Sequence, residues 1–142
     1  MVDKDLIYAK AGAIKRHCKR ITAKSGVDVE IFKIDLDRQE SVLFNLQMAI
    51  QNCIDIAAHI VSEEGYGVPG SSNELFYLLE EHNLIDRPLT EKMVRAIGLR
   101  NLIAHEYGTL DLEKIHHISK ENINDLDAFI KSILGKAAYF SQ

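Results

Sequence analysis

Several features that define whole classes of protein are missing from this sequence. No apolar run approaches the roughly 18 to 20 residues that a membrane-spanning helix needs, and the charged N-terminus contains no signal-peptide stretch. Two prolines and eight glycines in 142 residues exclude a collagen-like or linker-like polymer. Hydrophobic residues make up 46% of the chain, too large a share for a disordered protein. We therefore expect a cytoplasmic protein with one folded domain over residues 1–142.

Cysteine is also scarce. The two cysteines, Cys18 and Cys53, each lie within an apolar helical pattern, which is typical of reduced thiols in a protein core. Two cysteines are too few for a zinc site built from CxxC pairs. We expect reduced thiols and no zinc site of this type.

Charge is unevenly distributed along the chain. Residues 1–33 hold eight Lys/Arg and four Asp/Glu, whereas residues 34–142 hold nine and seventeen, for a net charge of −4. Residues 10–24 contain six basic side chains and no acidic one. A local basic face can contact phosphates even on an acidic protein, although a solvated helix face is the more ordinary explanation. The candidate phosphate-backbone contacts on this face are Lys15, Arg16, Lys19 and Arg20.

Helical periodicity dominates the sequence. Apolar residues recur at spacings of three and four, and no segment alternates apolar and polar residues as a strand would. Helices are expected at residues 3–24, from 35–37 to 64, and at 73–81, 89–107 and 111–138. The fold class is therefore all-α, a bundle of four or five helices. In the second helix two sets of apolar positions run side by side, so it is either central in the bundle or also buried against a second copy of the chain.

Arg100 is unusual on the helix expected over residues 89–107. At about 100° per residue it falls in the middle of the most apolar face, between Met93 and Ala96 in projection. A buried guanidinium is costly unless it is paired, and it does not lose its proton. An acid, a subunit boundary or an anionic ligand must therefore meet it.

Three more polar side chains flank the same groove. Asn101 and His105 lie one turn apart on an adjoining face, and Tyr107 projects next to Arg100. An ideal helix separates Arg100 from His105 by about 140°, so a distorted helix end or a twofold axis would have to bring them together. Residue chemistry leaves two explanations open. The cluster is either functional, or structural with His105 capping the helix and Arg100 paired with an acid such as Glu106.

The octamer RNLIAHEY, from Arg100 to Tyr107, resembles the Rx4HxY motif of HEPN (higher eukaryote and prokaryote nucleotide-binding) domains, in particular of HepT-type toxins. The likeness covers nearly the whole chain, roughly residues 6–134. It includes the long-helix segment 52–60, the segment 75–79 after a Pro/Ser loop, and the closing segment 123–130. The expected fold is thus a homodimeric, HEPN-like helical bundle.

The resemblance also implies a role for each motif residue. HepT-type proteins are metal-independent ribonucleases that act as homodimers, with the motif helices at the subunit interface. By this resemblance Arg100 and His105 are catalytic, and Asn101 completes the site. Tyr107 would accept AMP groups from an MntA-type nucleotidyltransferase antitoxin, which silences the nuclease. The partners would be RNA, this antitoxin and a second copy of the chain, and no metal or other cofactor would be needed.

The residue chemistry agrees with these roles. RNA carries its own nucleophile, the 2′-hydroxyl, so cleavage needs a group that moves protons near neutral pH and a fixed cation for the phosphorane charge. Imidazole suits the first task and the forked guanidinium the second. One alternative is a non-catalytic dimeric module that binds nucleotide or a nucleotidyltransferase, and another is a scaffold whose Arg100 only builds the interface. A catalytic Arg100 and His105 would line an open cleft, whereas interface residues would be occluded and paired.

Overall fold

The computed structural model describes residues 1–136, 138 and 140, and the long elements within this part are all helices. They are α1 (Lys4–Ser25), α2 (Val29–Ile34), α3 (Leu36–Glu64), α4 (Ser72–Glu81), α5 (Arg87–His105), the 3₁₀ helix η1 (Tyr107–Thr109) and α6 (Leu112–Gly135). The all-α class is confirmed. Five of the six α-helices correspond to expected ones, and α2 is an additional short helix.

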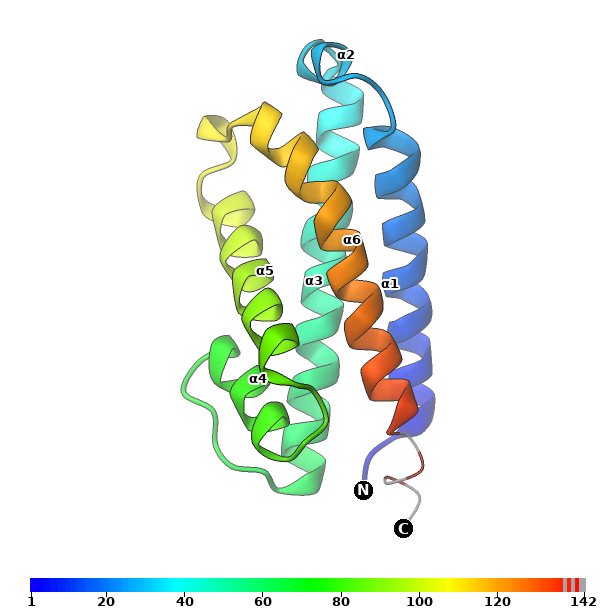
Figure 1. The fold of residues 1–142 in the computed structure, drawn as a ribbon, viewed down its shortest axis with the longest axis vertical. Coiled ribbons are helices and arrows are strands. Elements are labelled where there is room, and N and C mark those ends of the chain that lie inside the picture. Colours follow the sequence, from blue (N-terminus) through cyan, green and yellow to red (C-terminus); the bar gives the residue numbers. More distant parts are fainter. Residues whose placement is uncertain (137, 139, 141–142) are drawn as a thin grey trace.

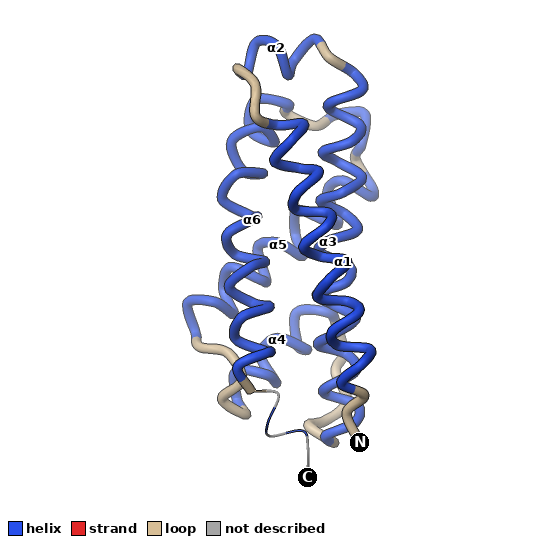
Figure 2. The backbone as a smooth tube through the Cα atoms, turned by 90° about the vertical axis from the view of Figure 1, so that its right-hand side faces the viewer, coloured by secondary structure: helices blue, strands red, loops and turns tan. Residues whose placement is uncertain are grey.

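Four long helices form the body of the molecule. α1, α3, α5 and α6 run along its long axis, α2 lies across one end, and α4 packs near the other (Figure 1). Figure 2 shows α1 and α3 side by side over much of their length. Because α3 contacts every other α-helix, the first of the two predicted alternatives, a central position in the bundle, is confirmed. No helix in the described part of the chain is long and apolar enough to span a bilayer.

Side-chain caps fix where most of these helices begin. In each case the oxygen of the residue before the helix accepts a hydrogen bond from a backbone N–H of the first turn, which would otherwise have no partner. The capping residues are Asp3, Asp35, Ser71, Asp86 and Asp111. Each such cap contributes about 1 kcal/mol, so short polar residues at the boundaries define the bundle's element lengths.

The extra helix α2 is held by a contact between distant parts of the chain. Phe32 is fully buried, and its ring lies 5.3 Å from the ring of His116 on α6. His116 in turn donates from Nε2 to the carbonyl oxygen of Val27, 2.7 Å away. These contacts fasten α2 across the end of the bundle where α5 also terminates (Figure 1).

The thiols agree with the sequence prediction. Cys18 is half-buried, Cys53 is buried, and both are free. Burial, with a smaller contribution from Asp127, raises the pKa of the Cys18 thiol to about 11. Burial also raises the pKa of Cys53 well above its usual range.

Two predicted helix ends are wrong. α5 was expected to reach Tyr107 but ends at His105, because Glu106 leaves helical geometry at φ −130° and ψ 35°. Tyr107 therefore begins η1, and the helical projection that placed its side chain next to Arg100 does not apply. The last helix ends at Gly135 rather than at 138, and residue 137 lies outside the described residues.

Candidate active site at the end of helix α5

Arg100 lies on the buried face of α5, as its position in the sequence predicts. On the same face Met93 is fully buried, and Ala96 and Ile103 are at most 2% exposed. Arg100 itself is half-buried. Its Nε is enclosed and has no hydrogen-bond partner, and its guanidinium forms no ion pair within the described part of the chain.

An enclosed donor without a partner costs roughly 1–3 kcal/mol. No acid offsets that cost within the described residues, so the predicted structural alternative, in which Arg100 pairs with Glu106, is wrong for the single chain. A partner from outside the chain, either an anion or a second subunit, fits this arrangement better than a purely structural role.

The other motif residues are open to solvent. Asn101 and His105 are exposed on α5, and Tyr107 is 50% exposed on η1. Their side chains form no hydrogen bond with any described residue. The expected alternative in which His105 caps the helix is therefore wrong. The backbone N–H of Glu106 instead donates to the Leu102 carbonyl oxygen at 2.9 Å.

The four motif residues thus gather in the last two turns of α5 and the start of η1. No hydrogen bond joins any two of them within the described chain. Arg100 faces inward and His105 outward, as their separation on the helix predicts. The arrangement supplies an unpaired cation, an unpaired imidazole and an amide next to one another along the chain, but does not by itself form a closed site.

Sequence reasoning missed a set of exposed apolar side chains on α3 and α5. Phe44 and Met48 on α3 are 59% and 36% exposed, and Leu102 on α5 is 40% exposed. The two apolar sets of the long helix are Val42, Leu46, Ala49, Cys53, Ile56 and Ile60, and Leu43, Ile50, Ile54, Ala57 and Val61. Phe44 belongs to neither set, and this position outside both is the signal that could have identified it. The side of α3 that carries Phe44 is therefore left uncovered in the single chain.

The predicted basic residues lie on a different helix. All four candidate RNA contacts are exposed on α1. The C-terminal half of α1 runs toward the α2 end of the bundle, as does α5 (Figure 1). The candidates on that helix are Lys15, Arg16, Lys19 and Arg20.

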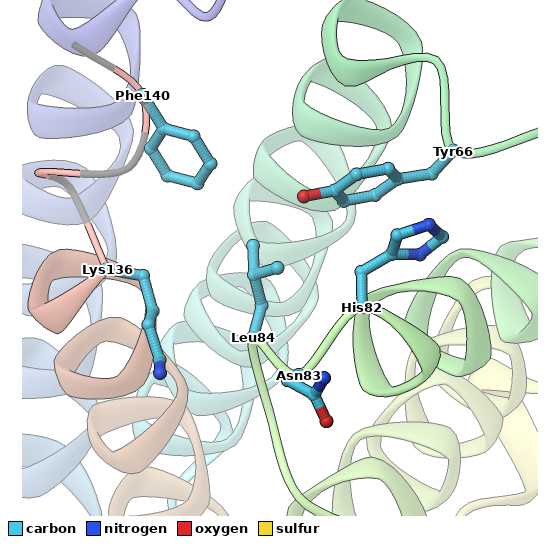
Figure 3. Close-up of a pocket in the computed structure, with 6 residues that line it drawn as sticks. All are labelled: Tyr66, His82, Asn83, Leu84, Lys136 and Phe140. Atoms are coloured by element: carbon cyan, nitrogen blue, oxygen red, sulfur yellow. The ribbon is translucent and has the colours of Figure 1, made fainter. Parts of the chain in front are cut away.

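A cavity of about 230 Å³ lies near the end of the bundle where α4 packs, well away from the motif. The rings of Tyr66 and His82 stack at its edge with centroids 3.7 Å apart, while Lys136 and Phe140 approach from the side of α6 (Figure 3). Burial raises the pKa of the Tyr66 hydroxyl. None of the motif residues lines this cavity.

The chain resembles known ribonucleases over most of its length. Residues 14–133 match the family described as Ribonuclease HepT-like. The mRNA nuclease HepT of Shewanella oneidensis is 40% identical over 129 residues, which cover 91% of this chain and 96% of that protein. The chain belongs to the HepT-like ribonuclease family. The HEPN-type ribonuclease predicted from the sequence is thereby confirmed at the level of the family.

A solved structure and a second ribonuclease add detail. The solved structure of a tri-AMPylated Shewanella oneidensis HEPN toxin in complex with MNT antitoxin superimposes with a TM-score of 0.86 at 40% identity, covering 92% of this chain and 98% of that one. The tRNA nuclease HepT of Aphanizomenon flos-aquae is 24% identical over 110 residues, 78% of this chain and 75% of that protein. The individual roles of Arg100, Asn101, His105 and Tyr107 remain predictions.

Proposed function

We propose that this protein is a metal-independent endoribonuclease toxin, a single domain over residues 1–142 that acts in the cytoplasm as a homodimer. The observation that carries the proposal is the unpaired Arg100 in a chain of the HepT-like family. A half-buried guanidinium that forms no ion pair within the described chain is available to an oxyanion, and its planar fork matches two phosphate oxygens.

The proposed cleavage uses the substrate's own hydroxyl as nucleophile. The 2′-oxygen attacks the adjacent phosphorus and gives its proton to one imidazole, while the bond to the 5′-oxygen breaks and that oxygen receives a proton from a second imidazole. Arg100 stabilises the negative charge of the phosphorane, and Asn101 completes the phosphate site. The products carry a 2′,3′-cyclic phosphate and a 5′-hydroxyl, so no water molecule is consumed in this step.

A homodimer supplies the second imidazole. A twofold axis near the uncovered side of α3 would bring both motif helices together, with one His105 acting as base and the other as acid. The exposed Phe44, Met48 and Leu102 support such an interface, because apolar side chains of this size are usually buried when a partner is present.

Tyr107 is the proposed site of control. An MntA-type nucleotidyltransferase would transfer AMP from ATP to the tyrosine oxygen, which loses its proton as pyrophosphate leaves. Tyr107 is 50% exposed on η1, so another protein can approach the residue. The added phosphate would lie close to the motif helix, where its negative charge and bulk would compete with RNA.

The test uses an RNA oligonucleotide with one defined cleavage site and the same oligonucleotide with a single 2′-deoxy nucleotide at that site. Antitoxin-free protein should cleave the first in EDTA, leaving a 2′,3′-cyclic phosphate visible by mass spectrometry, and should leave the second intact. Cleavage of both would contradict the proposed nucleophile. Binding without cleavage, with Tyr107 unmodified by mass, would instead favour the non-catalytic nucleotide- or nucleotidyltransferase-binding module.

A further inference from the structure

We propose that the exposed basic face of α1, here called the α1 strip, binds the phosphate backbone of an RNA strand and guides it to the end of α5. The strip consists of Lys15, Arg16, Lys19 and Arg20. The proposal rests on the proposed function, because it takes RNA as the substrate, and it adds where the strand lies outside the reaction centre.

The first support is that the strip's charges are unused. None of its four side chains forms an ion pair or a hydrogen bond within the described part of the chain. Elsewhere the cations are commonly paired: Lys10 with Asp55 at 3.0 Å, and Arg87 with Glu80 at 3.0 Å. Acidic residues outnumber basic ones, 21 to 17, so an unneutralised cluster is not a by-product of composition.

The second support is the spacing of the charges. Lys15 and Lys19 are one helical turn apart, as are Arg16 and Arg20, so the strip has two parallel rows of cations. Within each row the side chains begin about 6 Å apart along the axis. Successive phosphates along an extended RNA strand are spaced by a similar distance. Contacts of this kind release counterions from the nucleic acid and provide affinity without sequence preference.

The third support is the position of the strip relative to the motif. α3 contacts both α1 and α5, and the end of α1 is fixed to it by Arg38, whose Nη1 donates to the Lys24 carbonyl oxygen at 3.2 Å. Further along, His17 donates from Nδ1 to Oδ1 of Asn45, 2.7 Å away. The strip and the motif thus lie on two helices that both pack against α3 and run toward the same end of the bundle (Figure 1).

The decisive experiment distinguishes an effect of the strip on RNA binding from an effect of the protein's net charge. All RNA-binding measurements use a His105→Ala background, so the labelled single-stranded RNA is not cut. The strip variant carries Arg16→Gln, Lys19→Gln and Arg20→Gln. The matched control carries Lys114→Gln, Lys120→Gln and Lys131→Gln, three exposed lysines on α6 with the same loss of charge. Because all six side chains lie on the surface, both variants should keep the circular dichroism and melting temperature of the parent.

The strip variant should bind RNA roughly 10- to 100-fold more weakly at 0.1 M salt, with a log–log salt slope shallower by about 2, or about 0.7 per lost contact to a single strand. With His105 restored, KM should rise while kcat changes less than about twofold. The control should bind like the parent. Equal weakening in both variants, or unchanged binding in the strip variant, would overturn the proposal.

Two other outcomes also have defined meanings. If the strip variant keeps its RNA affinity but no longer binds the antitoxin, the strip is a protein-docking surface and the proposal is wrong. If the parent with intact His105 never cleaves RNA but binds it through the strip, the cleavage proposal fails while the strip's contact with RNA stands. The strip proposal and the cleavage proposal can therefore be overturned independently of each other.

Discussion

Arg100 and His105 lie on the same helix in opposite environments: Arg100 is half-buried with an enclosed, unpaired Nε, whereas His105 is exposed at the last position of α5. A half-buried cation that forms no ion pair can bind an oxyanion, and an imidazole at the surface can exchange protons with solvent. The different environments of the two residues follow from their spacing in the sequence. They suit Arg100 to stabilise charge and His105 to transfer protons.

The first prediction concerns Arg100 and separates function from stability. Arg100→Met keeps the length of the side chain but removes the unpaired donor. Cleavage should fall by about 100-fold or more, as it does when a group that stabilises transition-state charge is removed. The melting temperature should stay the same or rise by a few degrees, because an uncompensated buried polar group has been removed. The cleavage rate and the melting temperature are measured on the same preparation. A large drop in melting temperature with cleavage retained would show that Arg100 is structural.

A second prediction concerns the uncovered side of α3. Phe44→Glu places a charge on the proposed subunit interface, so size-exclusion chromatography with light scattering should show a monomer and cleavage should fall with it. The control is Val68→Glu, since Val68 is 97% exposed on the loop before α4. That variant should remain dimeric and active. A Phe44→Glu protein that is still dimeric would place the interface elsewhere.

The third prediction tests the modification site. With purified antitoxin and ATP, Tyr107→Phe should gain no AMP by mass and should stay active, because the ring is kept and only the acceptor oxygen is lost. Tyr8→Phe serves as the control, since Tyr8 is 52% exposed on α1. That variant should be modified and silenced like the parent. AMP on the Tyr107→Phe protein would assign the acceptor to another residue.

A fourth prediction follows from the thiols. Because burial raises the pKa of Cys18 to about 11, the thiolate is scarce at neutral pH. Alkylation of Cys18 by iodoacetamide in the native protein should be slow at pH 8, and its rate should rise about tenfold per pH unit up to pH 10. Cys53 should react only after unfolding, which mass spectrometry can follow. Rapid, pH-independent labelling of Cys18 would contradict its burial.

Much of the fold could be predicted from the sequence because long helices carry strong periodic signals. The position of Arg100 on a buried face was evident from projection alone. The helix α2 was not expected, because six residues are too few to show a stripe, and α2 depends on the contact between Phe32 and His116. The end of α5 was misplaced by two residues: the first residue after the pattern that commonly ends a helix is Gly108, whereas the backbone leaves the helix at Glu106. Whether Arg100 finds an acid depends on side chains from several helices, which no single segment reveals.

The most direct test of the central claim is cleavage of RNA in EDTA by antitoxin-free protein, comparing wild type, His105→Ala and His117→Ala at matched dimer content. His117 is an exposed histidine on α6, outside the motif, and controls for the loss of an imidazole. We expect wild type and His117→Ala to cleave at similar rates and His105→Ala to be inactive. Equal cleavage by all three proteins would contradict the assignment of the chemistry to the end of α5.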